Sequence, residues 1–440
     1  MHWLDNLLFT IILLAGVGYF AYHLRKTIRN IKLGRPYDRS DRKKERWRNM
    51  LLKAFGQKKM FKRPVPALLH LAVYLGFIII NIEVIEIIID GIFGTHRVLR
   101  FMGGFYNFLI ASFEILALLV IIAVTVFWIR RNILKLWRFH MPEMEGWPKK
   151  DANLILYFEF VLMSAFLTMN AADLKLQQLR YGHYYFKEGI VGSFPISKFL
   201  LGILPDDPHS LVMIERSMWW LHIVGILVFL NYLYISKHYH ILLAFPNTFY
   251  AKLPPLAKLD NLESVKKQVE LMMDPTADPY AMPEEEEEPE RFGAKDIFDL
   301  KWINLLNAYT CTECGRCSDV CPANSTGKKL SPRKIMMDVR DRTEEVGKII
   351  DKHGKFVDDG KSLLDYISAE EIWACTTCNA CVEECPVEND PMDVIIQLRQ
   401  YLVLEESAAP AELNLMFTNI ENNGAPWQYS QADRLNWVNE

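Results

Sequence analysis

Eight cysteines in two identical groups are the residues of this 440-residue chain best suited to chemistry. Each group reads C-x-x-C-x-x-C-x-x-x-C-P. The groups are Cys311, Cys314, Cys317 and Cys321, and Cys375, Cys378, Cys381 and Cys385. Three closely spaced thiolates can hold three corners of an iron–sulfur cubane on one loop, so the spacing predicts two 4Fe–4S clusters. Zinc is the alternative, but zinc sites normally pair two C-x-x-C knuckles and need no third evenly spaced cysteine.

The fourth cysteine of each group is expected to bind the cluster of the other group. The same run occurs in bacterial two-cluster ferredoxins, in which the fourth thiolate ligates the other cluster. The predicted ligands of the first cluster are Cys311, Cys314, Cys317 and Cys385, and those of the second are Cys375, Cys378, Cys381 and Cys321. Such tight grouping excludes a disulfide framework and indicates a reducing compartment.

The 53 residues that separate the two groups predict helices, not the short hairpins of small ferredoxins. Between Pro332 and Glu345 the apolar residues recur near helical spacing. We therefore expect an α-helical ferredoxin domain. The segments Tyr309–Cys317 and Ile372–Pro386 resemble the C-type iron–sulfur domain of heterodisulfide reductases, and the domain is also similar to that of succinate dehydrogenases. The resemblance covers residues 293–400.

Five apolar runs approach the ~20 residues that a helix needs to cross a bilayer. They cover residues 7–24, 65–90, 104–129, 153–171 and 218–245. A composition of 51% hydrophobic and 23% charged residues excludes a disordered or collagen-like chain. The first run does not fit a cleaved signal peptide, because its positive charges follow the apolar residues instead of preceding them. We therefore expect an all-α membrane protein with a five-helix transmembrane bundle and a retained N-terminal anchor.

The chain divides into a basic half and an acidic half. Residues 1–250 carry 30 Lys/Arg and 17 Asp/Glu, and the remaining residues carry 20 and 36, so the net charges are +13 and −16. The expected domains are a five-span domain at 1–250, an acidic Pro-rich linker at 251–292, the ferredoxin domain at 293–400 and a partner-docking tail at 401–440. The linker contains the run Glu284–Glu288, which suits a solvated tether or an acidic docking strip.

The loop charges predict the orientation of the spans. Loops 25–63 and 130–150 carry 16 and 6 Lys/Arg, whereas loops 91–103 and 172–217 carry 7 together. The positive-inside rule places the two basic loops in the cytoplasm. We therefore expect the bacterial cytoplasmic membrane, an external N-terminus, a folded external loop at 172–217 and a cytoplasmic ferredoxin domain.

Three histidines lie inside the predicted spans: His70 in the second, and His222 and His240 in the fifth. Ionisable groups are costly inside a bilayer and usually functional there, and histidine is a common axial ligand of haem iron. His222 and His240 are 18 residues apart, so on one continuous helix they share a face about 27 Å apart. His70 and His240 are expected at similar depth. They are the predicted ligands of a b-type haem near the cytoplasmic side.

The five spans and the stretch Ser236–Ile241 (SKHYHI) resemble the cytochrome b gamma subunit of membrane nitrate reductases. That family has five spans, an external N-terminus and a histidine pair of the same separation on its fifth span. Its second span carries two histidines, whereas this sequence has His70 but Ile80 at the second position. A second, outer haem at His222 therefore lacks its expected partner, and His238 is an alternative ligand.

Two carboxylates, Glu83 and Glu86, lie near the outer half of the second span. They suit either a position at the external aqueous boundary or proton exchange with a quinone near Ile80. The competing quinone site is near the inner haem, where the polar groups are His238, Lys237 and Lys62.

Together these features resemble nitrate-reductase-gamma-like proteins fused to a heterodisulfide-reductase-like ferredoxin domain. Members of that group oxidise electron-transfer flavoprotein and reduce menaquinone, and use a cysteine-rich CCG domain. No cysteine follows Cys385, and Asn419–Trp437 resembles the segment that leads into that domain, so a separate CCG subunit is implied. We expect a membrane electron-transfer subunit of a quinone-linked oxidoreductase, with membrane lipid and quinone as partners and no nucleic acid. The alternatives are a redox-sensing or assembly protein and a quinol-oxidising anchor of a cytoplasmic reductase.

Overall fold

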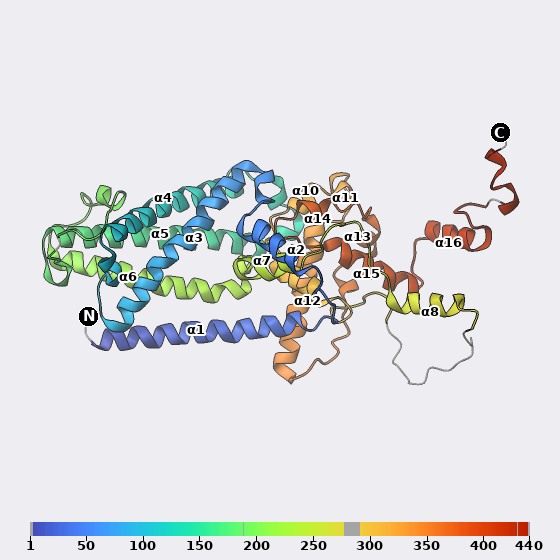
Figure 1. Cartoon of the computed structure of the whole chain (residues 1–440), viewed down its shortest axis with the longest axis horizontal. Helices are drawn as coiled ribbons and strands as arrows, with labels where there is room; N and C mark the ends of the chain where they lie inside the picture. Colours follow the sequence, from blue (N-terminus) through green and yellow to red (C-terminus); the bar gives the residue numbers. More distant parts are fainter. Residues whose placement is uncertain (1–2, 188, 277–290, 429, 439–440) are drawn as a thin grey trace.

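The structure, a computed structural model, describes residues 3–187, 189–276, 291–428 and 430–438. The run Glu284–Glu288 lies outside the described residues. The described residues form helices, turns and loops, and their β pairing is confined to an isolated bridge between Arg35 and Lys301. The long helices lie along one end of the molecule and the shorter helices of the cysteine-bearing region gather at the other (Figure 1). The predicted all-α fold is confirmed.

Five helices are long and apolar enough to cross a membrane. They are α1 (Trp3–Ile31), α3 (Pro64–Phe93), α4 (Gly104–Asn132), α5 (Trp147–Gln178) and α6 (Pro208–Tyr232). The helices α3, α4, α5 and α6 pack against one another in chain order, and α1 packs on α6 and α3. Buried aromatic and aliphatic side chains, including Tyr106, Phe113 and Phe166, fill the space between them.

The fifth span differs from its prediction. It was expected at 218–245, but α6 ends at Tyr232 and is followed by two 3₁₀ turns and the short helix α7 (His240–Phe249). Asp151, near the start of α5, accepts hydrogen bonds from the hydroxyls of Tyr232 (2.5 Å) and Ser236 (2.7 Å) and from the backbone N–H of Lys237 (3.0 Å). These contacts satisfy the chain where the helix stops. The expectation of a continuous helix that presents His222 and His240 on one face is therefore wrong.

The cysteine-bearing region is built from helices joined by tight loops. They are α9 (Trp302–Thr310), α10 (Arg316–Asp319), α11 (Pro322–Ser325), α12 (Pro332–His353), α13 (Ala369–Ala374), α14 (Ala380–Glu384) and α15 (Pro391–Leu404). The two longest begin at capped N-termini: Ser331 accepts from the Lys334 N–H, and Asp390 accepts from the Asp393 N–H. The predicted helices between the two cysteine groups are thus present. Helices α2 (Lys43–Met50), α8 (Glu263–Met273) and α16 (Ala411–Asn423) lie outside this region.

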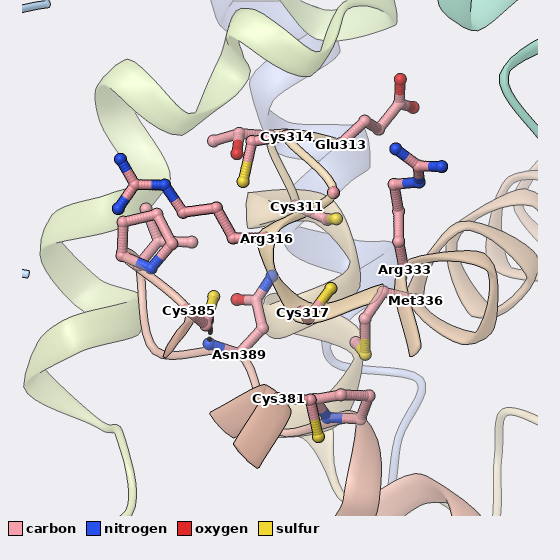
Figure 2. A pocket seen from close by; sticks show the side chains of 15 residues that line it. Cys311, Glu313, Cys314, Arg316, Cys317, Arg333, Met336, Cys381, Cys385 and Asn389 are labelled. Carbon is pink, nitrogen blue, oxygen red and sulfur yellow. Dashed lines mark hydrogen bonds between the residues drawn. The ribbon is translucent and has the colours of Figure 1, made fainter. Parts of the chain in front are cut away.

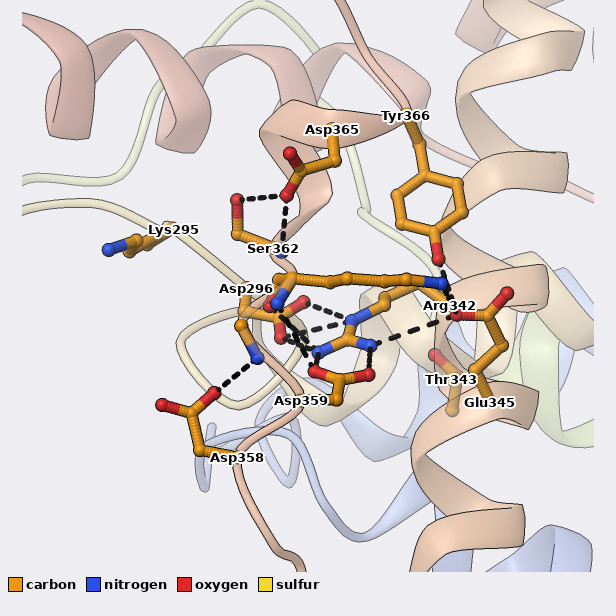
Figure 3. Close-up of polar contacts among 12 residues, drawn as sticks. Lys295, Asp296, Arg342, Thr343, Glu345, Asp358, Asp359, Ser362, Asp365 and Tyr366 are labelled. Carbon is orange, nitrogen blue, oxygen red and sulfur yellow. Dashed lines mark hydrogen bonds and ion pairs between the residues drawn. The ribbon is translucent and has the colours of Figure 1, made fainter.

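A buried arginine on α12 holds the long loop before α13 in place (Figure 3). The guanidinium of Arg342, which is fully buried, donates to both carboxylate oxygens of Asp296 and of Asp359 at 2.6–3.1 Å. It also donates to the backbone carbonyl of Lys361 (2.9 Å). Two bidentate pairs use the full fork of the side chain, so Arg342 fastens the segments around Asp296 and Asp359 to α12.

Opposite charges join the two halves of the chain. Basic residues of the loop after α1 and of the approach to α3 meet acidic residues of the cysteine-bearing region. The pairs are Lys26–Asp351, Arg29–Asp351, Lys53–Glu388, Lys62–Glu383, Arg63–Asp319 and Arg63–Glu384. Part of the +13 and −16 asymmetry therefore serves contact between the two halves.

Candidate metal centres

The two cysteine loops share one backbone conformation. Glu313 and Gly315 in the first loop have positive φ values of 52° and 72°, and Thr377 and Asn379 occupy the equivalent places in the second at 54° and 61°. Left-handed residues at both positions are uncommon outside glycine and asparagine. Because they recur at the same two steps of each loop, the duplicated spacing corresponds to a duplicated structure.

The first pocket is lined by Cys311, Cys314, Cys317 and Cys385 and holds ≈ 360 Å³ of space. The sulfur atoms of these four residues surround a common space, whereas the sulfur of Cys381 lies apart and points away (Figure 2). The set matches the crossed ligands expected for the first cluster, with Cys385 arriving from the second group. Four thiols and the absence of competing carboxylates among the described lining residues other than Glu313 fit a 4Fe–4S cluster.

The second pocket has the complementary set. It holds ≈ 330 Å³ and is lined by Cys375, Cys378, Cys381 and Cys321, the last from the first cysteine group. Apolar side chains such as Leu330 and Met392 complete the wall. All eight cysteines are free of disulfides. The assignment of each thiol as a ligand stays a prediction, and the geometry fits it.

The thiols are poor acids without a bound metal. Burial raises the pKa of Cys311 to about 11 and, together with the neighbouring Cys314 thiol, that of Cys385 to about 12. A metal ion favours the thiolate, so binding iron releases these protons. Backbone N–H groups already aim at sulfur: Thr377 donates to Cys375 (3.4 Å) and Asn389 to Cys385 (3.3 Å).

The rings of His70, on α3, and His240, at the start of α7, lie beside each other with centres 6.4 Å apart. Two imidazoles that bind opposite sides of one metal at about 2 Å each have ring centres roughly 6 Å apart. Both rings are only part-buried, so neither is closed off by protein atoms. The sequence-predicted pair is thus brought together, even though the fifth span ends before His240.

Hydrogen bonds orient both rings as ligands. The Nδ1 atom of His70 lies 3.0 Å from the side-chain oxygen of Gln57, and Nδ1 of His240 lies 3.1 Å from the backbone carbonyl of Lys237. Because each acceptor holds the proton on Nδ1, the Nε2 lone pair is left for a metal, as in most histidine metal sites. The pair therefore fits a haem iron, which would supply one-electron chemistry at this position.

His222 and His238 are placed differently. His222 is 1% exposed, its Nδ1 lies 3.0 Å from the Leu162 carbonyl, and its aromatic neighbour among the described residues is Phe166. The structure does not bring a second histidine to it, and its role in binding haem stays a prediction. His238 lies beside His240 (5.2 Å between ring centres) and Phe229.

Glu83 and Glu86 lie inside the bundle, not at the aqueous boundary, since they are 4% and 3% exposed. Glu86 accepts from the Leu99 N–H (2.8 Å) and the Tyr106 hydroxyl (2.9 Å). One carboxylate oxygen of Glu83 has no hydrogen-bond partner in the described part of the chain. A buried oxygen without a partner is costly, so Glu83 is suited to exchange a proton or to bind a polar ligand.

Three residues near the metal centres were not identified from the sequence as parts of a site: Gln57, Glu313 and Arg316. Glu313 is held by ion pairs with Lys237 and Arg340, which keep its pKa below the ordinary value although burial acts to raise it. Glu313 and Arg316 lie between the first three cysteines, a signal that was available. Gln57 precedes the second span with no spacing to mark it.

Comparisons with known proteins agree with this site. The family model for the 4Fe-4S dicluster domain matches residues 310–389. The probable iron-sulfur-binding oxidoreductase FadF of Bacillus subtilis is 31% identical over 99% of this chain and 61% of its own length. The EtfAB:quinone oxidoreductase of Syntrophomonas wolfei is 25% identical over 98% of this chain and 59% of its own.

A shorter match covers the cysteine-bearing region. The C-subunit of the ferredoxin/F(420)H(2)-dependent CoB-CoM heterodisulfide reductase of Methanosarcina acetivorans is 32% identical over 27% of this chain and 60% of its own length. No solved structure matches the chain. The chain spans about three fifths of the length of the two relatives that match it throughout.

The fold and the comparisons define the class. The chain is an iron–sulfur electron-transfer protein with five helices able to cross a membrane. It is related to iron–sulfur oxidoreductases, and its ferredoxin region is of the heterodisulfide reductase C kind.

Proposed function

We propose that the protein is a membrane component that carries electrons between a cytoplasmic redox partner and menaquinone. Its domains are a five-span haem b domain at 1–250, an acidic linker at 251–292, a two-cluster ferredoxin domain at 293–400 and a docking tail at 401–440. The first cluster is held by Cys311, Cys314, Cys317 and Cys385, the second by Cys321, Cys375, Cys378 and Cys381, and the haem by His70 and His240.

The observation that carries the proposal is that both histidines connect to the first cysteine loop. His240 bonds to the carbonyl of Lys237, whose ammonium pairs with Glu313 of that loop. His70 bonds to Gln57, two and three residues before the backbone carbonyls of Lys59 and Met60, which accept from Arg316 of the same loop. A redox sensor needs no such contact with a histidine pair, whereas electron transfer requires neighbouring centres.

The chemistry requires both one-electron carriers and a proton donor. Clusters and haem supply one-electron carriers, and menaquinone accepts two electrons and two protons to give menaquinol. The protons come from water through protein groups. We place this exchange near Glu83, whose buried oxygen lacks a partner, and the competing position lies near Lys237 and Lys62. There, however, the ammonium groups already pair with Glu313 and Glu383.

The orientation and the partners follow from the charge pattern and the resemblance. The basic loops, and the ferredoxin domain that pairs with them, lie in the cytoplasm of a bacterium, with the N-terminus outside. The partners are a separate CCG-domain subunit and electron-transfer flavoprotein, in line with the printed name of the EtfAB:quinone oxidoreductase relative. Helix α16 exposes Leu415, Phe417 and Ile420, which suit the docking of that subunit. Loss of its co-purification on deleting residues 411–438, with clusters retained, would test this.

The test of the function is quinone-dependent reoxidation. The purified chain is placed in liposomes with or without menaquinone, reduced with limiting dithionite under argon, and followed at the haem absorption band. We expect rapid reoxidation only where menaquinone is present. A haem that stays reduced in both kinds of liposome, or a chain that binds no haem, would contradict the proposal.

A further inference from the structure

Arg316 is a buried cation with no carboxylate partner among the described residues. Its side chain is 3% exposed and lies in the first cysteine loop, between Cys314 and Cys317. The guanidinium donates to the backbone carbonyls of Lys59 (3.2 Å) and Met60 (3.4 Å). Carbonyl groups supply dipoles but no net negative charge, and a buried charge without a counter-ion is expensive. The nearby cations have partners: Arg333 pairs with Glu143, and Arg340 with Glu313.

The groups that face Arg316 belong to the proposed redox centres. The thiols of Cys314 and Cys385 interact electrostatically with its guanidinium, and so does the ring of His70. Figure 2 shows the side chain extending from the first pocket, past Cys314 and Cys385. Four thiolates outweigh the positive charge of a 4Fe–4S core, so an occupied first pocket is anionic. The missing counter-charge of Arg316 is then the cluster itself.

The surroundings of the second pocket are less positive. Its cation, Arg399, is only part-buried and donates to the carbonyls of Ile372 (2.7 Å) and Cys375 (2.5 Å). The carboxylate of Asp390 acts on Cys381 of that pocket and opposes the charge of Arg399. Cluster potentials depend on net local charge and burial, and positive charge favours the reduced form.

We propose that Arg316 is the counter-charge of the first cluster and holds its reduction potential above that of the second cluster. The inference rests on the proposed function, since it requires both clusters to be bound. It makes the cluster nearest His70 the more readily reduced of the two. Arg316 also anchors that loop to the Gln57–Met60 segment, which orients His70.

An EPR-monitored redox titration of the purified full chain tests this. In R316Q we expect one cluster to lose at least a factor of ten in its reduction equilibrium, ~59 mV toward lower potential for a one-electron couple, while the other is unchanged. R316K retains the charge and should stay near the wild-type value. R399Q is the matched control, and it should lower the potential of the other cluster only.

Unchanged potentials in an R316Q protein that contains both clusters would overturn the proposal. If R316Q binds only one cluster, R316K decides. A first cluster with wild-type potential in R316K supports the role of charge, whereas its loss there too shows a packing role and overturns the proposal. A wild-type chain without clusters would instead contradict the proposed function, before any variant is compared.

Discussion

The rings of His70 and His240 lie 6.4 Å apart, although one residue is in the second membrane helix and the other begins a short helix after the fifth. The break at Ser236, held by Asp151, turns the chain so that His240 reaches His70. Each ring is oriented through Nδ1, which leaves Nε2 free. The pair is therefore positioned by tertiary contacts on both sides.

Replacing His70 or His240 with Ala should remove the b-type haem, because each supplies one axial ligand. The haem absorption spectrum of the purified variants measures this, with iron analysis to show that both clusters remain. H23A is the matched control, since His23 stacks on Tyr234 outside the pair. H222A asks whether a second haem exists, and an unchanged spectrum there indicates one haem. Full haem content in both H70A and H240A would refute the assignment.

Crossed ligation predicts different effects for two cysteines four residues apart. C385A should impair the first cluster, as C317A does, whereas C381A should impair the second, as C321A does. Wild-type protein should contain about eight iron and eight sulfide per chain, since each 4Fe–4S cluster has four of each. EPR signals of the reduced variants separate the two clusters. If C381A and C385A lost the same signal, or the chain held zinc, the crossed arrangement would be excluded.

Arg342→Met should destabilise the ferredoxin region strongly. The substitution leaves Asp296 and Asp359 without their shared partner, and removal of one member of a buried ion pair costs about 3 kcal/mol or more. Cluster absorbance should therefore be lost at a lower temperature than in wild type. K361M is the control, because the Lys361–Glu345 pair is exposed and worth little. Equal melting of R342M and wild type would show that the carboxylates do not depend on Arg342.

Much of the fold could be predicted because it depends on local pattern. Apolar runs of spanning length, two identical cysteine groups and helical spacing between them each report on a single stretch of chain. The end of the fifth span could not be predicted in this way. The residues after Tyr232 remain apolar, and the helix stops because of contacts with Asp151, which lies 81 positions away from Tyr232 in the sequence.

The site shows the same division. The eight cysteines and the His70–His240 pair were identified by residue type and spacing, and the structure groups them as expected. The burial of Glu83 and Glu86 was left open, because sequence alone does not show which face of α3 meets α4. The role of Arg316 depends on what surrounds its guanidinium, and its partners come from a segment more than 250 positions earlier.

Glu83→Gln should slow menaquinone reduction while leaving dithionite reduction of the haem intact. The amide keeps the size of the side chain but cannot release a proton, and the free oxygen of Glu83 is the group that we expect to exchange one. N81A, on the same helix, is the control, since the Asn81 amide bonds only to the preceding turn. Reoxidation of the reduced protein by a soluble menaquinone analogue gives the rate. Full turnover in E83Q would move the quinone site toward the cytoplasmic side.

The most direct test of the electron route is single-turnover reoxidation of the clusters in wild type, H70A and H23A. Each protein is reduced anaerobically and mixed with a menaquinone analogue, and the clusters are followed by freeze-quench EPR. If electrons pass through the centre held by His70 and His240, the clusters of wild type and H23A are reoxidised rapidly, and those of H70A at least tenfold more slowly. Equally rapid reoxidation in H70A that lacks haem would contradict that route.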